Sequence, residues 1–207
     1  MRRRISQFLS NESTFGRLMT RVYVLFGANL CFLLFSLPVI TIGPALAGLY
    51  YVCLRAIRGD GDISPWREFF CGFKSSFKLS LLYELGLFLF LALAYVDLRF
   101  TASVGGIFTV FRYAILALLF FVLLLTMHFF PVVAAFSSDF RGTLRNALFF
   151  AAKNPLRGLI MLAIYALAFG ATALDERMRP LYVFLWAVVG FSGLAMICSC
   201  LLKKDFE

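Results

Sequence analysis

An uncharged run of 33 residues, from Val22 to Leu54, constrains this chain more than any other feature. A helix that crosses a bilayer needs only about 20 apolar residues, because the hydrocarbon core is about 30 Å thick. Within the run, Pro38 lacks the N–H of a helix interior, and Pro44 suits the first turn of a new helix. The run therefore predicts two short helices, 22–37 and 44–57, joined by a turn between the two prolines.

Further apolar segments follow this run and set the fold class. The chain is 62% hydrophobic and 15% charged, against about 45–50% and about 25% in soluble domains. The segments do not alternate apolar and polar residues, as the strands of a membrane barrel do. We therefore expect an all-α, polytopic helical membrane protein with about six membrane segments in a single domain, residues 1–207. The later segments are 79–97, 107–130, 156–174 and 181–202.

The distribution of Lys and Arg predicts the orientation. With the first two segments arranged as a hairpin, 16 of these residues lie on one side of the membrane and four on the other. If 22–54 were one span, the division would be nine to 11. Because Lys and Arg are retained on the cytoplasmic side, we expect both termini in the cytoplasm, including a basic N-terminal segment, 1–21. The first two helices are roughly 24 and 21 Å long, so a re-entrant hairpin stays open as an alternative.

Two cytoplasmic segments, 58–78 and 137–155, are expected to form amphipathic helices at the membrane surface. Each places its apolar residues at helical spacing, and in the first they form an aromatic stripe. The aromatic residues are Trp66, Phe69, Phe70, Phe73 and Phe77. Basic residues on other faces predict contact with anionic lipid headgroups or with a partner protein. They are Arg67, Lys74, Lys78, Arg141 and Arg145.

Glu84 and His128 are the candidates for chemistry inside the membrane. Glu84 is the only acidic residue well inside an apolar segment, and His128 is the only histidine. Their expected depths are similar, so a contact between them is allowed. One interpretation is a proton or substrate site of a transporter. The sequence favours the other, a polar pair that fixes helix packing, because polar groups near a helix end reach water.

The sequence contains none of the common catalytic, nucleotide-binding or metal-binding motifs. We therefore expect no enzyme activity, no cofactor and no metal site. The net charge of +9 follows from Lys and Arg retained in the cytoplasm, so nucleic acid is not an expected partner.

Several motifs between Asn29 and Lys78 resemble a known family. They are the apolar span that begins at Asn29, the turn S-L-P-V-I-T-I-G-P, the pair Tyr50-Tyr51, the pair Arg58-Gly59 and the motif F-F-x-G-F-K-x-x-F-K. The stretch RNALFFAAKNPLRGL at 145–159 adds to the likeness. Together they resemble the YesL family of small bacterial membrane proteins, a family without an established biochemical function.

The resemblance implies a multi-pass protein of the bacterial plasma membrane. Members of that family are often encoded beside systems for carbohydrate uptake and degradation. We therefore expect an accessory or interaction protein linked to carbohydrate uptake, whose partner is a sugar transport system or its regulator. The alternative is a small proton-coupled or solute transporter that uses Glu84 and His128. The resemblance implies no catalytic or binding residue, and the oligomeric state stays open.

Overall fold

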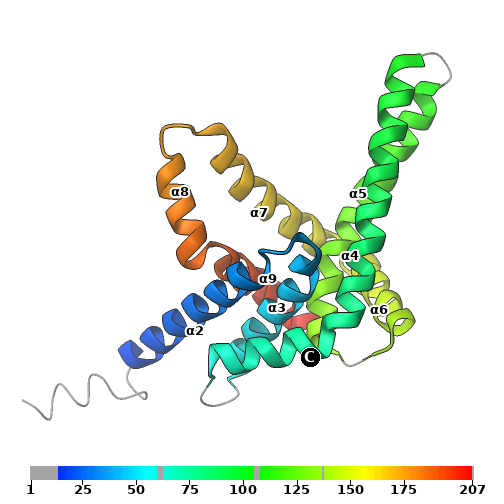
Figure 1. The fold of residues 1–207 in the computed structure, drawn as a ribbon. Coiled ribbons are helices and arrows are strands. Elements are labelled where there is room, and N and C mark those ends of the chain that lie inside the picture. Colours follow the sequence, from blue (N-terminus) through cyan, green and yellow to red (C-terminus); the bar gives the residue numbers. More distant parts are fainter. Residues whose placement is uncertain (1–13, 60–62, 105–107, 137, 207) are drawn as a thin grey trace, which may run out of the picture.

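Helices make up nearly all of the described chain in this computed structural model, which describes residues 14–59, 63–104, 108–136 and 138–206 (Figure 1). Of the expected segments, residues 1–13 of the basic N-terminal one, residues 60–62 and residue 137 lie outside the described residues. The elements in order are α2 (Thr14–Phe35), η1 (Val39–Thr41), α3 (Ile42–Arg58), α4 (Pro65–Val104), α5 (Phe108–Ala135), α6 (Phe140–Lys153), α7 (Pro155–Leu174), α8 (Arg179–Leu185), η2 (Trp186–Gly190) and α9 (Phe191–Phe206). η2 is a π-helical segment that joins α8 to α9.

Five helices are long and apolar enough to cross a membrane, and α2 adds a shorter apolar helix, Met19–Phe35. The five are Val39–Arg58, Pro65–Ala102, Phe108–Ala135, Pro155–Leu174 and Arg179–Phe206. Large apolar side chains stay exposed along α4, α5, α7 and α8, which is expected where hydrocarbon surrounds the protein. The prediction of an all-α multi-pass membrane protein is confirmed, with one of the six apolar segments shorter than the rest. The placement of both termini in the cytoplasm stays a prediction.

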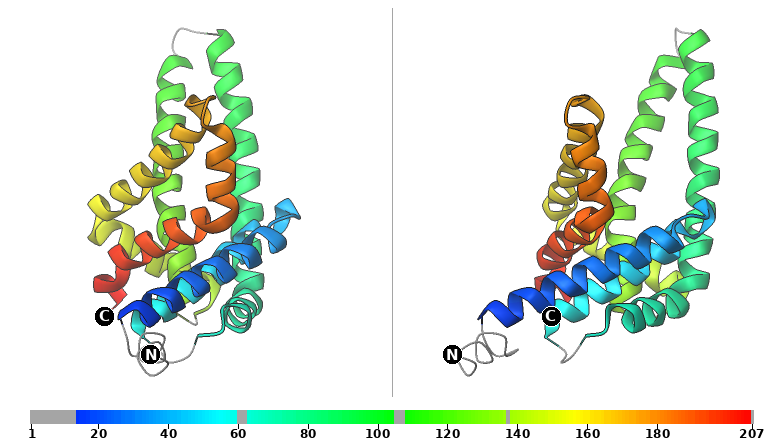
Figure 2. Two further views of the ribbon diagram at one scale, coloured as in Figure 1. Left: turned by 90° about the vertical axis from the view of Figure 1, so that its left-hand side faces the viewer. Right: turned by 60° about the vertical axis from the view of Figure 1, so that its left-hand side comes forward.

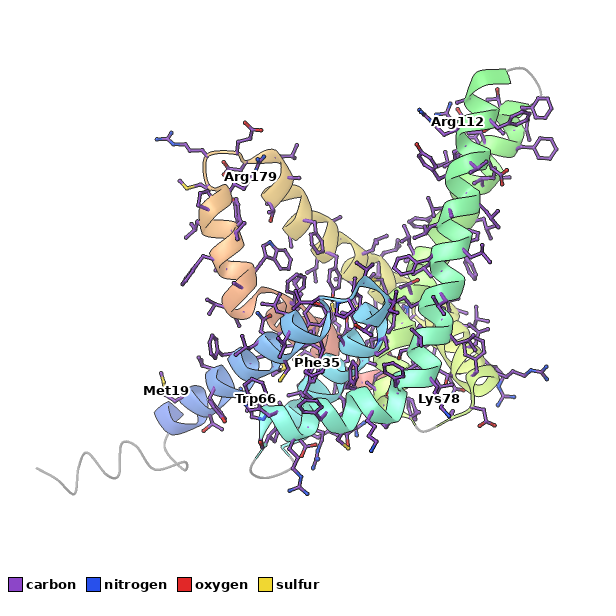
Figure 3. All side chains as sticks on the ribbon, viewed as in Figure 1. Met19, Phe35, Trp66, Lys78, Arg112 and Arg179 are labelled. Atoms are coloured by element: carbon purple, nitrogen blue, oxygen red, sulfur yellow. The ribbon has the colours of Figure 1, made fainter. Side chains whose placement is uncertain are left out.

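Two helical hairpins diverge from a common base, as Figures 1 and 2 show. One is formed by α4 and α5, and the other by α7 and α8. The C-terminal ends of α3, α5 and α9 lie at the same end of the molecule as α6 and the first part of α4. We call this the basal end. Arg112 and Arg179 lie at the opposite end, near the turns of the two hairpins (Figure 3).

Helix α4 differs from the expectation of a surface helix followed by a separate span. It is one continuous helix of 40 residues, Pro65–Val104, and it bends near Lys78, so that its first part lies across the basal end (Figures 1 and 3). No proline or glycine stands between Phe73 and Leu85 to end the helix. In contrast, Asn154-Pro155 separates α6 from α7, as the restricted backbone before a proline favours.

The structure confirms the hairpin predicted at Pro38–Pro44. α2 ends at Phe35 and α3 begins at Ile42, so that Pro44 lies in the first turn of α3. The Thr41 hydroxyl lies 2.6 Å from the carbonyl oxygen of Phe35 and 2.8 Å from that of Pro38, and shares its proton between them. Thr41 therefore satisfies carbonyl groups that the end of α2 and the turn leave open.

The turn of this hairpin lies about half-way along α4 and does not reach the far end of the molecule (Figure 2). Gly43, at the start of α3, contacts Glu84 of α4. α4 continues for another 20 residues beyond Glu84 to Val104, a rise of about 30 Å. The α2–α3 hairpin therefore extends along only part of the length of α4.

Helix α3 is the centre of the molecule, and most of its residues between Gly43 and Leu54 are buried. It crosses α4 closely at two glycines. A Cβ atom on Gly72 would lie 2.5 Å from the Cβ of Tyr51, and one on Gly48 would lie 3.0 Å from the Phe69 carbonyl oxygen. The small residues therefore allow the two backbones to approach, as in other membrane helix pairs.

This close crossing divides the aromatic stripe of α4. Phe69 is fully buried, whereas Trp66 and Phe70 stay exposed. Phe35 of α2 packs against the stripe, with its ring centroid 5.8 Å from Phe69, 5.0 Å from Phe70 and 5.2 Å from Phe73. The stripe therefore joins α4 to the hairpin, and only part of it remains available to lipid.

Candidate functional site

Glu84 is buried in the hairpin core and binds the start of α3. Its Oε2 accepts a hydrogen bond of 3.0 Å from the backbone N–H of Gly43. Gly43 has little room for a side chain, because a Cβ there would lie 3.0 Å from Glu84 Oε2 and 3.1 Å from the Ser80 carbonyl oxygen. A carboxylate at this position satisfies an N–H that has no partner within its own helix.

His128 is buried at the contact between α5 and α7. Its Nδ1 lies 3.0 Å from the carbonyl oxygen of Leu124, so Nδ1 carries a proton and donates. A Cβ on Gly158 would lie 2.7 Å from the imidazole Cε1, so the glycine makes room for the ring. Within the described residues, no hydrogen bond or ion pair joins His128 to Glu84. The structure gives each of the two a different set of partners.

A buried ionic cluster at the basal end joins α7 to α9. Arg157 forms an ion pair with Asp205, whose side chain is only 4% exposed. The Nδ2 of Asn154 donates a hydrogen bond of 2.6 Å to Asp205 Oδ1. Sequence reasoning missed this cluster, because Asp205 follows Lys203 and Lys204 and resembles part of a solvated tail.

Asn29 is a second polar contact that sequence reasoning missed. It is completely buried, and its Nδ2 donates to the carbonyl oxygens of Trp186 (2.9 Å) and Ala187 (2.8 Å). Its Oδ1 accepts a hydrogen bond of 3.1 Å from the backbone N–H of Ser192. One side chain of α2 therefore holds both sides of the π-helical segment, a wide turn that often marks functional sites. A single amide inside the apolar run was the available signal.

The five basic residues predicted to face a partner or lipid are all exposed, and all lie on α4 and α6 at the basal end. In the part of the chain that the structure describes, none of them forms an ion pair. We call them the cationic surface: Arg67, Lys74, Lys78, Arg141 and Arg145. In contrast, Arg55 of α3 forms an ion pair with Glu68 of α4, and so links the two helices beside this surface.

A cavity of about 990 Å³ opens at the basal end between α3, the first part of α4 and the end of α5. Tyr51, Arg58 and Ser76 line its α3 and α4 walls. The residues from Val133 to Phe136 line the α5 wall, and Asp139 lies at the edge that leads into α6. Sequence reasoning did not predict the cavity, because its walls come from three separate segments.

Among the residues described, no group of three or more His, Cys, Asp or Glu side chains is arranged to hold a metal ion. Cys53 and Cys198 are buried free thiols, and the Cys53 thiol lies 3.8 Å from the Ser192 carbonyl oxygen, a contact that explains it as a packed core residue.

The comparisons with known proteins cover part of this architecture. Residues 25–98, which span the second half of α2, all of α3 and α4 as far as Leu98, match the family described as protein of unknown function, DUF624. No curated protein and no solved structure matches the chain. The matched segment contains the contact between Glu84 and Gly43 and two walls of the cavity. Over residues 25–98, this chain therefore carries the sequence pattern of that family of unknown function.

Proposed function

We propose that this chain is a membrane accessory protein that docks an acidic partner protein on the cationic surface. The observation that carries the proposal is the exposure of five basic side chains on α4 and α6, with no ion pair among the described residues. Surface cations that lack internal partners attract acidic partners, speed their association and set their orientation.

The cationic surface is carried by two helices, α4 and α6, that are held in place by different contacts. The first part of α4 is held on α3 by the close approach at Gly72 and by the ion pair between Arg55 and Glu68. α6 is a separate helix between the end of α5 and Asn154. A partner that bridges the two helices would therefore contact two separate elements, the first part of α4 and the shorter helix α6.

We propose further that the partner is a component of a sugar uptake system or its regulator. The support for this step is the resemblance of the segment from Asn29 to Lys78 to a family whose members are often encoded beside such systems. Anionic lipid headgroups would meet the same cations at the membrane surface, and the experiment separates the two kinds of partner.

Cross-linking in native membranes, followed by copurification with the full chain, tests the proposal. The variant carries Arg67→Glu, Lys74→Glu, Arg141→Glu and Arg145→Glu, and the control carries Arg112→Glu at the opposite end. We expect one protein to be recovered with the wild type and the control and lost from the fourfold variant. Recovery of the same proteins from all three would contradict docking. If only binding to anionic vesicles falls, the surface serves lipid.

Transport through Glu84 and His128 has less support. The Gly43 hydrogen bond and the packing against Gly158 give both residues structural roles. Solute uptake into vesicles reconstituted with Glu84→Gln and His128→Ala variants tests this alternative. Uptake by the wild type that both substitutions abolish, in variants that stay folded, would replace the accessory role with a transport role.

A further inference from the structure

We propose that the basal cavity binds a phosphate ester, with its anionic oxygens on the α3 and α4 walls and its apolar part on the α5 wall. The volume of about 990 Å³ is in the range of pockets that hold small organic ligands. The inference goes beyond partner docking, because no residue of the cationic surface lines this cavity.

The first observation is an unpaired guanidinium at the cavity. Arg58 lines the wall, and among the described residues it has no ion-pair partner. Arg55, one turn earlier and also in the lining, is already engaged by Glu68. The charge available to a ligand therefore comes from Arg58, whose planar array of N–H donors matches the oxygens of a phosphate group.

The second observation is a hydroxyl in the cavity wall. Ser76 lines the cavity, the residue as a whole is only 4% exposed, and in the described part of the chain its hydroxyl forms no hydrogen bond. The hydroxyl can therefore donate a hydrogen bond to a ligand in the cavity. The Tyr51 hydroxyl accepts a contact of 3.9 Å from the Cys71 thiol, which leaves its own proton free to donate.

The third observation is the unequal character of the walls. Arg58, Tyr51 and Ser76 present donors on one side, and the segment from Val133 to Phe136 presents apolar side chains on the other. Asp139 is the acidic residue of the lining and pairs with neither arginine of the cavity. A ligand with an anionic head and an apolar portion satisfies both walls. Such an ester is either a phospholipid headgroup or a soluble phosphate metabolite.

The test measures ligand binding to the full chain, purified in a neutral detergent, by native mass spectrometry and by thermal stabilisation. The probes are phosphatidylglycerol and glycerol 3-phosphate, with phosphatidylcholine and glycerol as their respective comparisons. The variants are Arg58→Gln and Ser76→Ala. The matched control is Arg112→Gln, which removes the same charge at an exposed arginine of the opposite end, outside both the cavity and the cationic surface.

We expect saturable binding of at least one phosphate probe. Arg58→Gln should weaken it about tenfold or more, Ser76→Ala should weaken it severalfold, and Arg112→Gln should leave it unchanged. Binding of phosphatidylglycerol alone identifies a lipid site, and binding of glycerol 3-phosphate identifies a soluble ester. The inference is overturned if neither probe saturates, or if Arg112→Gln weakens binding as much as Arg58→Gln does.

This readout is independent of partner docking. The fourfold charge-reversal variant retains Arg58 and Ser76, so it can lose the copurified protein and still bind phosphate in the cavity. Loss of phosphate binding in the cavity variants leaves the cationic surface intact. A folding control for both cavity variants is size-exclusion chromatography, in which the elution volume should match that of the wild type.

Discussion

The side chain of Glu84 caps the start of α3, through a hydrogen bond of 3.0 Å to its Oε2 from the backbone N–H of Gly43, 41 residues earlier in the chain. Gly43 is the second residue of α3, so this N–H has no carbonyl partner within the helix. The carboxylate also lies at the positive end of the helix dipole. An acidic residue inside an apolar segment is therefore explained by the hairpin that packs against it.

The cap at Glu84 should contribute measurably to stability. We expect Glu84→Ala to lower the free energy of unfolding by about 1–2 kcal/mol. Glu84→Gln should cost less, because the amide oxygen still accepts from Gly43. Thermal unfolding in detergent measures both, with Asp97→Ala as the control, since Asp97 is an exposed acid on the same helix. An Ala variant as stable as the wild type would show that the cap contributes nothing.

Gly72 and Gly86 lie on the same helix and should respond in opposite directions to substitution by alanine. A Cβ on Gly72 would lie 2.5 Å from the Cβ of Tyr51, which the backbone of α3 fixes in place, whereas a Cβ on Gly86 meets nothing within 4 Å. Gly72→Ala should force α3 and α4 apart and lower the unfolding temperature. Gly86→Ala should leave it unchanged or raise it, because alanine favours the helix by up to about 1 kcal/mol. Equal effects would mean that the two helices do not cross closely at Gly72.

Asn29 should hold the π-helical segment in place. Asn29→Ala removes the partners of the Trp186 and Ala187 carbonyl groups and of the Ser192 N–H. Leaving such groups unsatisfied costs about 1–3 kcal/mol each. We expect a marked loss of stability and a shift in the fluorescence of Trp186, measured in a Trp66→Phe background.

Asn146→Ala is the control for this change, because the described structure gives the Asn146 side chain no hydrogen bond. A fluorescence spectrum that is the same for the Asn29 variant and its background would argue against a link between α2 and the π-helical segment.

The ion pair between Arg157 and Asp205 should couple the end of α9 to the start of α7. A double-mutant cycle of Arg157→Ala and Asp205→Ala should give a coupling energy of about 1–3 kcal/mol, because the pair is largely buried. The matched cycle on Arg179 and Glu176 should give less than about 1 kcal/mol, because that pair is exposed. Equal coupling energies from the two cycles would contradict a structural role for the buried pair.

The hairpin and the fold class could be predicted from the sequence because both depend on local chemistry. Pro38 removes a backbone donor, and the absence of charge from Val22 to Leu54 leaves only a membrane or a buried core. The same local logic failed at the start of α4. The sequence between Phe73 and Leu85 contains no residue that ends a helix, so the boundary expected after Lys78 had no physical basis, and a bend took its place.

The polar contacts of the core could not be predicted, because their partners are distant in the chain. Asn29 and Ser192 are separated by 163 residues, and Asn154 and Asp205 by 51. Every residue has a backbone carbonyl group, so the sequence does not indicate which of them accepts a hydrogen bond from a side chain. The sequence marks Glu84 as an acidic residue in an apolar segment, but its partner is a backbone N–H, which every residue except proline offers.

The turn of the α2–α3 hairpin, beside the middle of α4, combines an apolar outer surface with internal hydrogen bonds. The outer surface of the turn is apolar, because large apolar side chains are exposed there. They are Leu37 (76% exposed), Val39 (60%) and Ile40 (56%). Inside the turn, the Thr41 hydroxyl supplies the proton that a water molecule would give to a loop at a protein surface. The turn therefore satisfies the carbonyl groups of Phe35 and Pro38 with a side chain of its own and needs no water molecule to do so.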